Sequence, residues 1–188
     1  MLIDLKKLVK HVSHEPEVSS SKEGRNKHLV FKPQAYALRS ESPVQVQQEK
    51  LTEWLIRCYM AMEDPGWQVS RFGCEKCEFE EFRHIIENFA IPFAQTKPVA
   101  QFVLEGCELS NMAFFTFLRE LEAEKVNLRN NNFSAEQLSM IARAAADNPR
   151  VKQVMLGGGK RRFPEEAVRN AVEGRAFTLT KKHELHFD

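Results

Sequence analysis

Two cysteines and a histidine have a spacing that could support metal or thiol chemistry. Cys74-x-x-Cys77 is a spacing found in zinc sites and in thioredoxin-like redox motifs, and His84 follows shortly after it. Zinc sites of this kind normally carry a second ligand pair at recognisable spacing, and none is visible in the sequence. We therefore expect structural cysteines and no metal or cofactor. The alternative is a small metal- or thiol-dependent enzyme using these three residues.

A second stretch, residues 157–162 (GGGKRR), has the glycines and cations of a phosphate cradle. A P-loop would need Gly at position 154 and Ser or Thr at position 161, where this chain has Val154 and Arg161. We expect a lengthened, solvated turn. The alternative is a basic loop in which Lys160 and Arg161 receive an acidic group of a partner.

No other motif indicates catalysis. The six histidines are not accompanied by a nucleophile motif, and both G-x-S-x-G and H-E-x-x-H are absent. We therefore predict no catalytic residues and a protein that is not an enzyme.

The composition and charge of the chain limit the kinds of partner that it is expected to bind. The chain has 188 residues, 27 basic and 26 acidic, and 43% of its residues are hydrophobic, which is enough for a sizeable core. Balanced charge argues against a large nucleic-acid or membrane-binding face, because phosphate binding generally needs excess Lys and Arg. No secretory signal and no apolar run of transmembrane length is visible, and four cysteines fit reduced thiols. We expect a cytoplasmic protein.

The N-terminal part, residues 1–68, precedes the next domain and is expected to support it. We expect an extension over residues 1–41 with a mobile polar linker near 19–28, and Pro33 argues against a central strand there. Ser42-Pro43 is a helix start signal, and Asp64-Pro65-Gly66 is a stop signal, so residues 42–68 hold a helix that caps the next domain. Its apolar stripe contains Leu51, Trp54, Leu55, Cys58, Tyr59 and Met62.

From residue 72 onward one pattern recurs. Two apolar residues separated by one are followed, at fixed distances, by Asn or Cys and then by Leu or Phe. The copies begin at Phe72, Phe102, Val126 and Val154. The first three carry Cys77, Cys107 and Asn131 at the Asn/Cys position, whereas the fourth has Gly159 and two extra residues before Phe163. Such self-similarity is typical of repeat architectures.

The pattern has a physical explanation. Two apolar residues separated by one point the same way from a strand, and the turn after the strand leaves backbone groups that need partners. A buried Asn amide can satisfy several of them, and a small Cys can occupy the same position with a weak donor. Ser134-x-x-Gln137 then predicts a capping box at the start of the helix that follows Asn131. Asn130 and Asn132 are predicted to be turn residues, because asparagine tolerates unusual backbone angles.

This pattern resembles the leucine-rich repeat, L-x-x-L-x-L-x-x-N/C-x-L, with the longer repeats of the ribonuclease-inhibitor and tropomodulin type. The resemblance covers residues 69–175. It implies an α/β fold, a short solenoid of about four strand–helix repeats capped by the N-terminal helix. Residues 176–188 are expected to form a closing strand or a tail.

In such a solenoid the residues between the inward apolar ones line a concave face used for binding. The predicted partner-binding residues on and beside this face are Arg71, Glu75, Val103, Glu105, Asn127, Arg129 and Met155, with Lys160 and Arg161 in the basic loop. The mixed character of these side chains favours a protein partner. The resemblance therefore implies a non-catalytic adaptor, regulator or inhibitor, either a host cytosolic protein or an effector delivered into a host cell by a bacterium.

Overall fold

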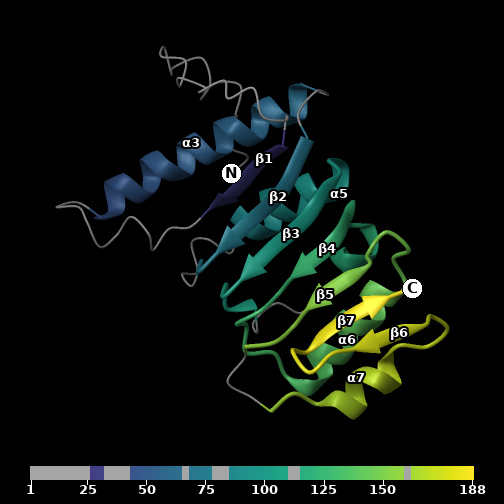
Figure 1. Ribbon diagram of the computed structural model, residues 1–188. Coiled ribbons are helices and arrows are strands. Elements are labelled where there is room, and N and C mark those ends of the chain that lie inside the picture. Colours follow the sequence, from purple (N-terminus) through teal and green to yellow (C-terminus); the bar gives the residue numbers. More distant parts are fainter. Residues whose placement is uncertain (1–25, 32–42, 65–67, 78–84, 110–114, 159–161) are drawn as a thin grey trace.

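The chain forms a mixed α/β fold around a seven-stranded sheet (Figure 1). The computed structural model describes residues 26–31, 43–64, 68–77, 85–109, 115–158 and 162–188. Five parallel strands come first: β1 (Asn26–Phe31), β2 (Gln68–Glu75), β3 (Val99–Glu105), β4 (Ala123–Asn127) and β5 (Gln153–Met155). Strands β6 (Phe177–Leu179) and β7 (Glu184–Phe187) form an antiparallel hairpin, and β7 pairs with β5.

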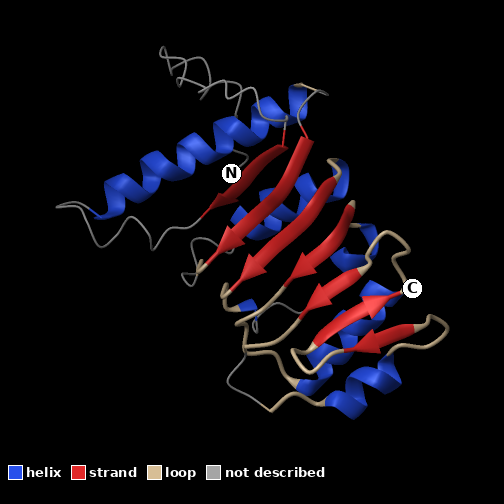
Figure 2. Cartoon of the chain, viewed as in Figure 1, coloured by secondary structure: helices blue, strands red, loops and turns tan. Residues whose placement is uncertain are grey.

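The described helices lie on one side of the sheet, so that its other face is open toward the viewer in Figure 2. α3 (Pro43–Glu63) connects β1 to β2. A π-helical turn, η1 (Ile86–Ala90), and α5 (Ile91–Thr96) connect β2 to β3. The 3₁₀ helix η3 (Phe115–Glu120), α6 (Ala135–Ala146) and α7 (Glu165–Ala171) follow β3, β4 and β5 in turn. No described helix combines the length and apolar character needed to cross a bilayer.

The hydrogen-bonding register reproduces the predicted alignment of the recurring segments. Phe72, Phe102, Val126 and Val154 are successive partners across β2 to β5. All four are completely buried on the helix side. The residue three positions before each of them is also buried: Val69, Val99, Ala123 and Val151.

Aromatic rings fill the space between the first strands and their helices. The Phe72 ring stacks on Phe93 of α5 with 4.0 Å between centroids, and lies 5.7 Å from the Trp54 ring of α3. The Trp54 indole also donates a hydrogen bond to the Leu29 carbonyl of β1 at 3.0 Å. α3 is thereby fixed to both of the first two strands.

The bounds of α3 confirm the predicted start at Pro43 and stop after Glu63. The predicted apolar stripe is wrong at its end, because the Met62 side chain is 49% exposed whereas Ala61 is fully buried. One residue corresponds to about 100° around a helix. Ala61 continues the line from Trp54 and Cys58, and Met62 is rotated away from it.

Strand β1 corrects the interpretation of the N-terminal region. The predicted linker near 19–28 overlaps Asn26 to His28, which pair with β2; residues 19–25 lie outside the described part. Polar side chains do not prevent pairing, because the strand is held by backbone bonds. Leu29 and Phe31 are buried and lie in register with Phe72 and Cys74, so α3 connects two strands of the sheet instead of covering it alone.

The segments between successive strands differ in length and in the helices they contain. The segment from Phe102 to Val126 is the shortest; η3 is its six-residue described helix, and Leu121 after it is buried. The longer segment after β4 accommodates the 12-residue α6, which begins with the predicted Ser134–Gln137 capping box. The C-terminal residues form the expected closing strand, as a hairpin.

Candidate functional site

Asn131 connects two successive turns at the carboxyl ends of the strands. Its side-chain oxygen accepts hydrogen bonds from the Cys107 and Leu109 amides at 3.0 and 3.3 Å. Its amide nitrogen donates to the carbonyls of Leu104 at 2.8 Å, Leu128 at 2.9 Å and Arg129 at 3.2 Å. The predicted role of this buried Asn in satisfying turn backbone groups is confirmed.

Cysteines make part of the same bonding pattern in the preceding repeats. The Cys107 thiol donates to the Cys74 and Glu105 carbonyls at 3.4 Å, as Asn131 donates to the matching positions one strand later. The Cys77 thiol approaches the Glu75 carbonyl at 3.8 Å. A thiol supplies only one weak donor, so the turns that carry Cys77 and Cys107 are held by weaker side-chain bonds than the turn that carries Asn131.

The residue before the Asn/Cys position of each recurring segment, which is Gly159 in the fourth, has a left-handed backbone. Lys76, Gly106, Asn130 and Gly158 have φ of 56°, 62°, 61° and 86°. The amides of the first three donate to carbonyls of the next turn: Lys76 to Glu105, Gly106 to Arg129 and Asn130 to Gly157. The prediction for Asn130 is confirmed, whereas Asn132 is not among the described residues with positive φ, so the prediction is wrong there.

All four cysteines are buried and free. Burial raises the pKa of the Cys58 thiol well above its ordinary value, and a hydrogen bond with Cys77 together with burial raises the pKa of Cys107. For Cys74 a hydrogen bond with Cys77 lowers the pKa, but burial and the neighbouring thiols outweigh it. For Cys77 a hydrogen bond with Cys107 lowers the pKa, and a bond with Cys74 and burial raise it overall. His84, the third residue of the alternative site, lies outside the described residues.

The open face of the sheet carries the predicted binding residues. Its central row pairs Gly73, Val103, Asn127 and Met155 across four strands. Val103, Asn127 and Met155 are 0, 4 and 7% exposed, so these three form the floor of the face. That a partner binds over these three residues stays a prediction.

Charged side chains on either side of this row are largely engaged with one another. Arg71 forms an ion pair with Glu75 at 3.0 Å. The Glu105 carboxylate accepts hydrogen bonds from the side-chain amides of Asn127 and Asn130, both at 2.7 Å.

On the C-terminal side Arg129 forms an ion pair with Glu184 of β7. Glu184 also accepts from Gln153 at 3.2 Å and lies 3.4 Å from His186. Sequence reasoning missed Glu184, Gln153 and His186 as parts of this face. The alternating pattern of residues 184–187 could have placed Glu184 and His186 on one side of a strand.

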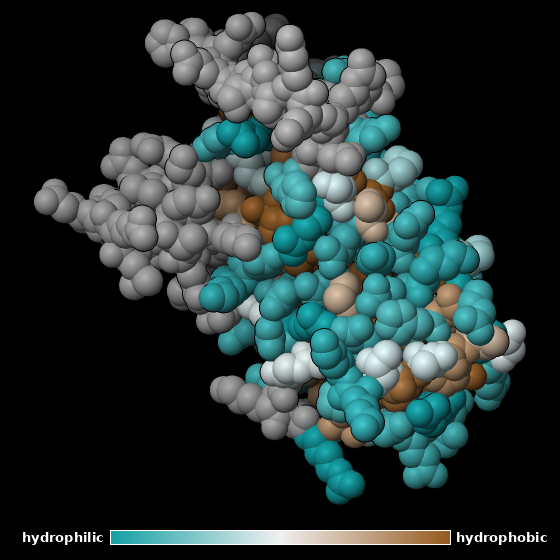
Figure 3. Space-filling model, viewed as in Figure 1, coloured by the Kyte–Doolittle hydropathy of each residue, from teal (hydrophilic) through white to brown (hydrophobic). Residues whose placement is uncertain are grey.

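Lys125 has no ion-pair partner among the described residues and is exposed, next to Gln101 in the register. Lys160 and Arg161, predicted to bind a partner through the basic loop, lie outside the described residues. On the open face the hydrophilic colours predominate among the described residues (Figure 3).

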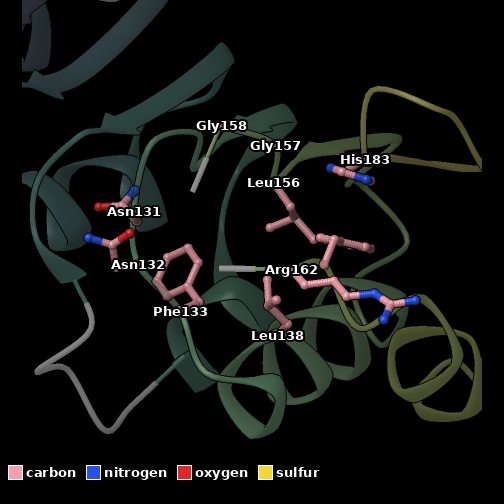
Figure 4. A pocket seen from close by; sticks show the side chains of 10 residues that line it. Asn131, Asn132, Phe133, Leu138, Leu156, Gly157, Gly158, Arg162 and His183 are labelled. Atoms are coloured by element: carbon pink, nitrogen blue, oxygen red, sulfur yellow. The ribbon is translucent and has the colours of Figure 1, made fainter. Parts of the chain in front are cut away.

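A small cavity lies beside Asn131, and Gly157 and Gly158 after β5 are among the residues that line it (Figure 4). Its volume is about 70 Å³. Phe133, Leu138 and Leu156 form its apolar walls, and Asn132, Arg162 and His183 are among its polar lining residues. The His183 ring stacks on Phe163 with 4.2 Å between centroids.

No protein-family model, curated protein or solved structure matches this chain. Across the described ranges no group of three or more His, Cys, Asp or Glu side chains has a geometry that could hold a metal ion.

Proposed function

We propose that this chain is a leucine-rich-repeat protein, a short solenoid of about four repeats, whose function is non-catalytic recognition of a protein partner on the open strand face. The partner would be regulated, inhibited or recruited by this contact. Support for the repeat type comes from the register of the apolar positions and from the equivalent bonds of Asn131 and Cys107.

The observation that carries the functional proposal is a face of the parallel strands that no described helix covers. Parallel sheets are almost always covered by helices on both faces. Here the described helices lie on one side, and the other presents a buried floor of Val103, Asn127 and Met155 between charged side chains. Strands lie about 4.8 Å apart and packed helices about 10 Å apart, so a sheet with helices on one side curves toward its bare face.

The face has the mixed chemistry of a protein-binding surface. Its ion pairs Arg71–Glu75 and Arg129–Glu184 cancel most of its charge, and Lys125 and Glu105 remain without opposite charges among the described residues. A surface for nucleic acid would need a net excess of cations. The thiol alternative gains no support, because the thiolate is the reactive and metal-binding form and the pKa of both Cys74 and Cys77 is raised.

The test is affinity capture with matched variants. The face variant is Gln101→Glu with Lys125→Glu, at adjacent positions in the register. The control is Asn170→Glu with Arg143→Glu, which makes the same change in charge at exposed positions on the helix side. Proteins captured from a native lysate are identified by mass spectrometry and then purified, and their affinity for each variant is measured.

We expect a partner that binds the wild type and the control equally and binds the face variant at least tenfold more weakly. Such a loss corresponds to about 1.4 kcal/mol of binding free energy. Equal binding of every captured protein to the face variant would refute recognition on this face.

A further inference from the structure

Two basic segments that are distant in the sequence meet at the cavity of Figure 4. The Leu156 amide donates to the His183 carbonyl at 3.0 Å, and Gly157 lies against the Lys182 carbonyl. Phe163 stacks on His183, which brings Arg162 to the same place. The turn between β6 and β7 therefore adjoins the end of the glycine-rich segment.

The two segments carry three basic residues between them. Arg162, Lys181 and Lys182 are exposed and have no ion-pair partner among the described residues. No described Asp or Glu lines the cavity. The nearby Glu165 is paired with Arg169 at 2.9 Å, and Glu184 is engaged by Arg129 on the open face.

The lining of the cavity combines apolar side chains with the polar groups of Asn131, Asn132 and the backbone of Gly157 and Gly158. Phe133, Leu138 and Leu156 turn toward it, whereas the guanidinium of Arg162 extends away from Phe133 and Leu138 (Figure 4). Its volume of about 70 Å³ is several times the roughly 10–15 Å³ that a cavity needs to hold one water molecule. It therefore suits a single aliphatic side chain and is far smaller than the pockets of about 300–1,000 Å³ that hold drug-sized ligands.

We propose that this cavity and its basic rim are a docking site for an acidic protein segment that inserts one aliphatic side chain. The aliphatic group fills the space between Phe133, Leu138 and Leu156. Asp or Glu residues flanking it contact Arg162 and Lys182. This site is separate from the open strand face and does not depend on recognition there.

Charge and shape together select this occupant. A free inorganic anion would gain from the cations but would leave the apolar walls unfilled. A purely apolar segment would fill the cavity but offer no negative charge to the three basic residues. Only an acidic segment with an aliphatic anchor satisfies both, and its binding is expected to weaken with salt because the rim is exposed.

The test uses the full chain and short fluorescent peptides, capped at both ends, in an anisotropy titration. The probe is Glu-Glu-Leu-Glu-Glu, and the comparison peptide has Ala in place of Leu. The rim variant is Arg162→Glu with Lys182→Glu. Its matched control is Arg143→Glu with Lys152→Glu, at exposed positions away from the cavity. Inorganic phosphate and anionic phospholipid vesicles are added as competitors.

We expect the Leu peptide to bind the wild type and the control equally, and the rim variant at least tenfold more weakly. The Ala peptide should bind about tenfold more weakly than the Leu peptide, because burying a leucine-sized side chain corresponds to at least that ratio. Equal binding of the two peptides, unchanged binding to the rim variant, or displacement by millimolar phosphate or by vesicles would each overturn the proposal. The strand-face variant Gln101→Glu with Lys125→Glu should bind the peptide normally, so this result is independent of the test of strand-face recognition.

Discussion

Asn131 makes five hydrogen bonds to backbone groups of two turns while it is only 3% exposed. Replacing it with Ala leaves the amides of Cys107 and Leu109 and the Leu104 carbonyl without their partner. A buried polar group left unsatisfied costs about 1–3 kcal/mol, so we expect Asn131→Ala to lower the free energy of unfolding by about 3 kcal/mol. Urea unfolding followed by circular dichroism measures the change.

Two further variants test the reason for that loss. Asn131→Cys should be less damaging than Asn131→Ala, because Cys107 shows that a thiol in this position still donates to the preceding strand. Asn170→Ala, at an exposed position of α7, should change stability by less than about 0.5 kcal/mol. If Asn131→Ala resembled Asn170→Ala, the assigned role of the buried amide would be wrong.

Gly73 lies in the central row of the open face with φ of 135°. A Cβ atom there would overlap the carbonyl oxygen of Val103 in the neighbouring strand. Gly73→Ala must therefore displace backbone, and we expect a loss of more than about 2 kcal/mol, beyond the 1–2 kcal/mol typical of left-handed strain alone.

Gly174 provides the matched control for Gly73. It also has a positive φ, 79°, but no atom lies within 4 Å of where its Cβ would be. Thermal unfolding should show a smaller loss for Gly174→Ala than for Gly73→Ala. Equal losses would mean that backbone angle alone, and not the approach of β3, makes glycine necessary at position 73.

The residues of the turns were only partly predictable. Asn131 could be recognised because its type and spacing matched two cysteines upstream. The left-handed backbone angle of Lys76 could not be predicted, because lysine has no preference for that conformation. Lys76 adopts it here as part of a stacked turn whose amide donates to the Glu105 carbonyl. Adjacent backbone bonds, and not local propensity, determine that angle.

At the scale of the elements, Arg175 holds the end of α6 against the closing hairpin. Its guanidinium donates to the carbonyls of Asn148 at 2.7 Å and Val151 at 3.0 Å, and lies 4.7 Å from the centre of the Phe187 ring. Lysine cannot reproduce this planar set of donors. We expect Arg175→Lys to reduce the free energy of unfolding by about 1–3 kcal/mol, since buried carbonyls lose their donors.

The comparison for Arg175 is another arginine at the same end of the molecule. Among the described residues Arg169 pairs only with Glu165, one turn earlier on the exposed face of α7. Arg169→Lys should change stability by less than about 0.5 kcal/mol, as is usual for exposed helix pairs. Similar losses for the two variants in guanidinium unfolding would contradict the bridging role.

Cys58 of α3 packs against the first strands, and burial raises its pKa well above the ordinary value of 9.0. Above that ordinary value the unfolded chain loses the thiol proton while the folded chain keeps it, so the stabilising contribution present below pH 9.0 is lost as the pH rises. Each such thiol steepens the fall in stability by up to about 1.4 kcal/mol per pH unit. Cys58→Ala should therefore show a shallower fall than the wild type above pH 9.0. Urea unfolding at a series of alkaline pH values measures both slopes, and parallel curves would contradict this origin of the pH dependence.

Helix and strand positions were predicted best where the apolar pattern was long. The bounds of α3 and the capping box of α6 follow from local signals at Pro43 and Ser134. The 3₁₀ form of η3 was not predicted by any local signal. Strand β1 was missed because its residues form a strand only when β2 is beside them.

At the scale of the whole molecule, the β6–β7 hairpin covers the end of the sheet. Leu185 and Phe187 are 0 and 5% exposed, and β7 supplies the outer partner of β5. Terminal repeats of a stacked array need a cap to stay soluble. We expect a chain ending at residue 176 to aggregate and to lose cooperative unfolding.

Size-exclusion chromatography and thermal scans measure both effects of that truncation. The control lacks only Asp188, which is exposed and follows the hairpin, and should remain monodisperse to the same degree as the full chain. If the chain without its hairpin stayed soluble and unfolded at the same temperature, the hairpin would have no capping role.

The candidate surfaces illustrate what sequence reasoning could reach. It placed Val103, Asn127 and Met155 in one row, because strand residues alternate in direction. It did not anticipate that Glu184 neutralises Arg129, or that Lys182 and Arg162 meet beside a cavity. Both depend on the antiparallel return of the last strand, which brings distant segments together.

The stacked turns have a consequence for how this chain could grow or shrink. Within the described residues each turn bonds to the next one through the same positions: Lys76 to Glu105, Gly106 to Arg129 and Asn130 to Gly157. An internal duplication of residues 99–122 would offer the backbone amide of each repeated turn an equivalent carbonyl in the next copy, although the side-chain partners Asn127, Asn130 and Asn131 would not be repeated. If the proposed repeat architecture holds, the number of strand–turn units is therefore a variable that gene duplication can change in whole units.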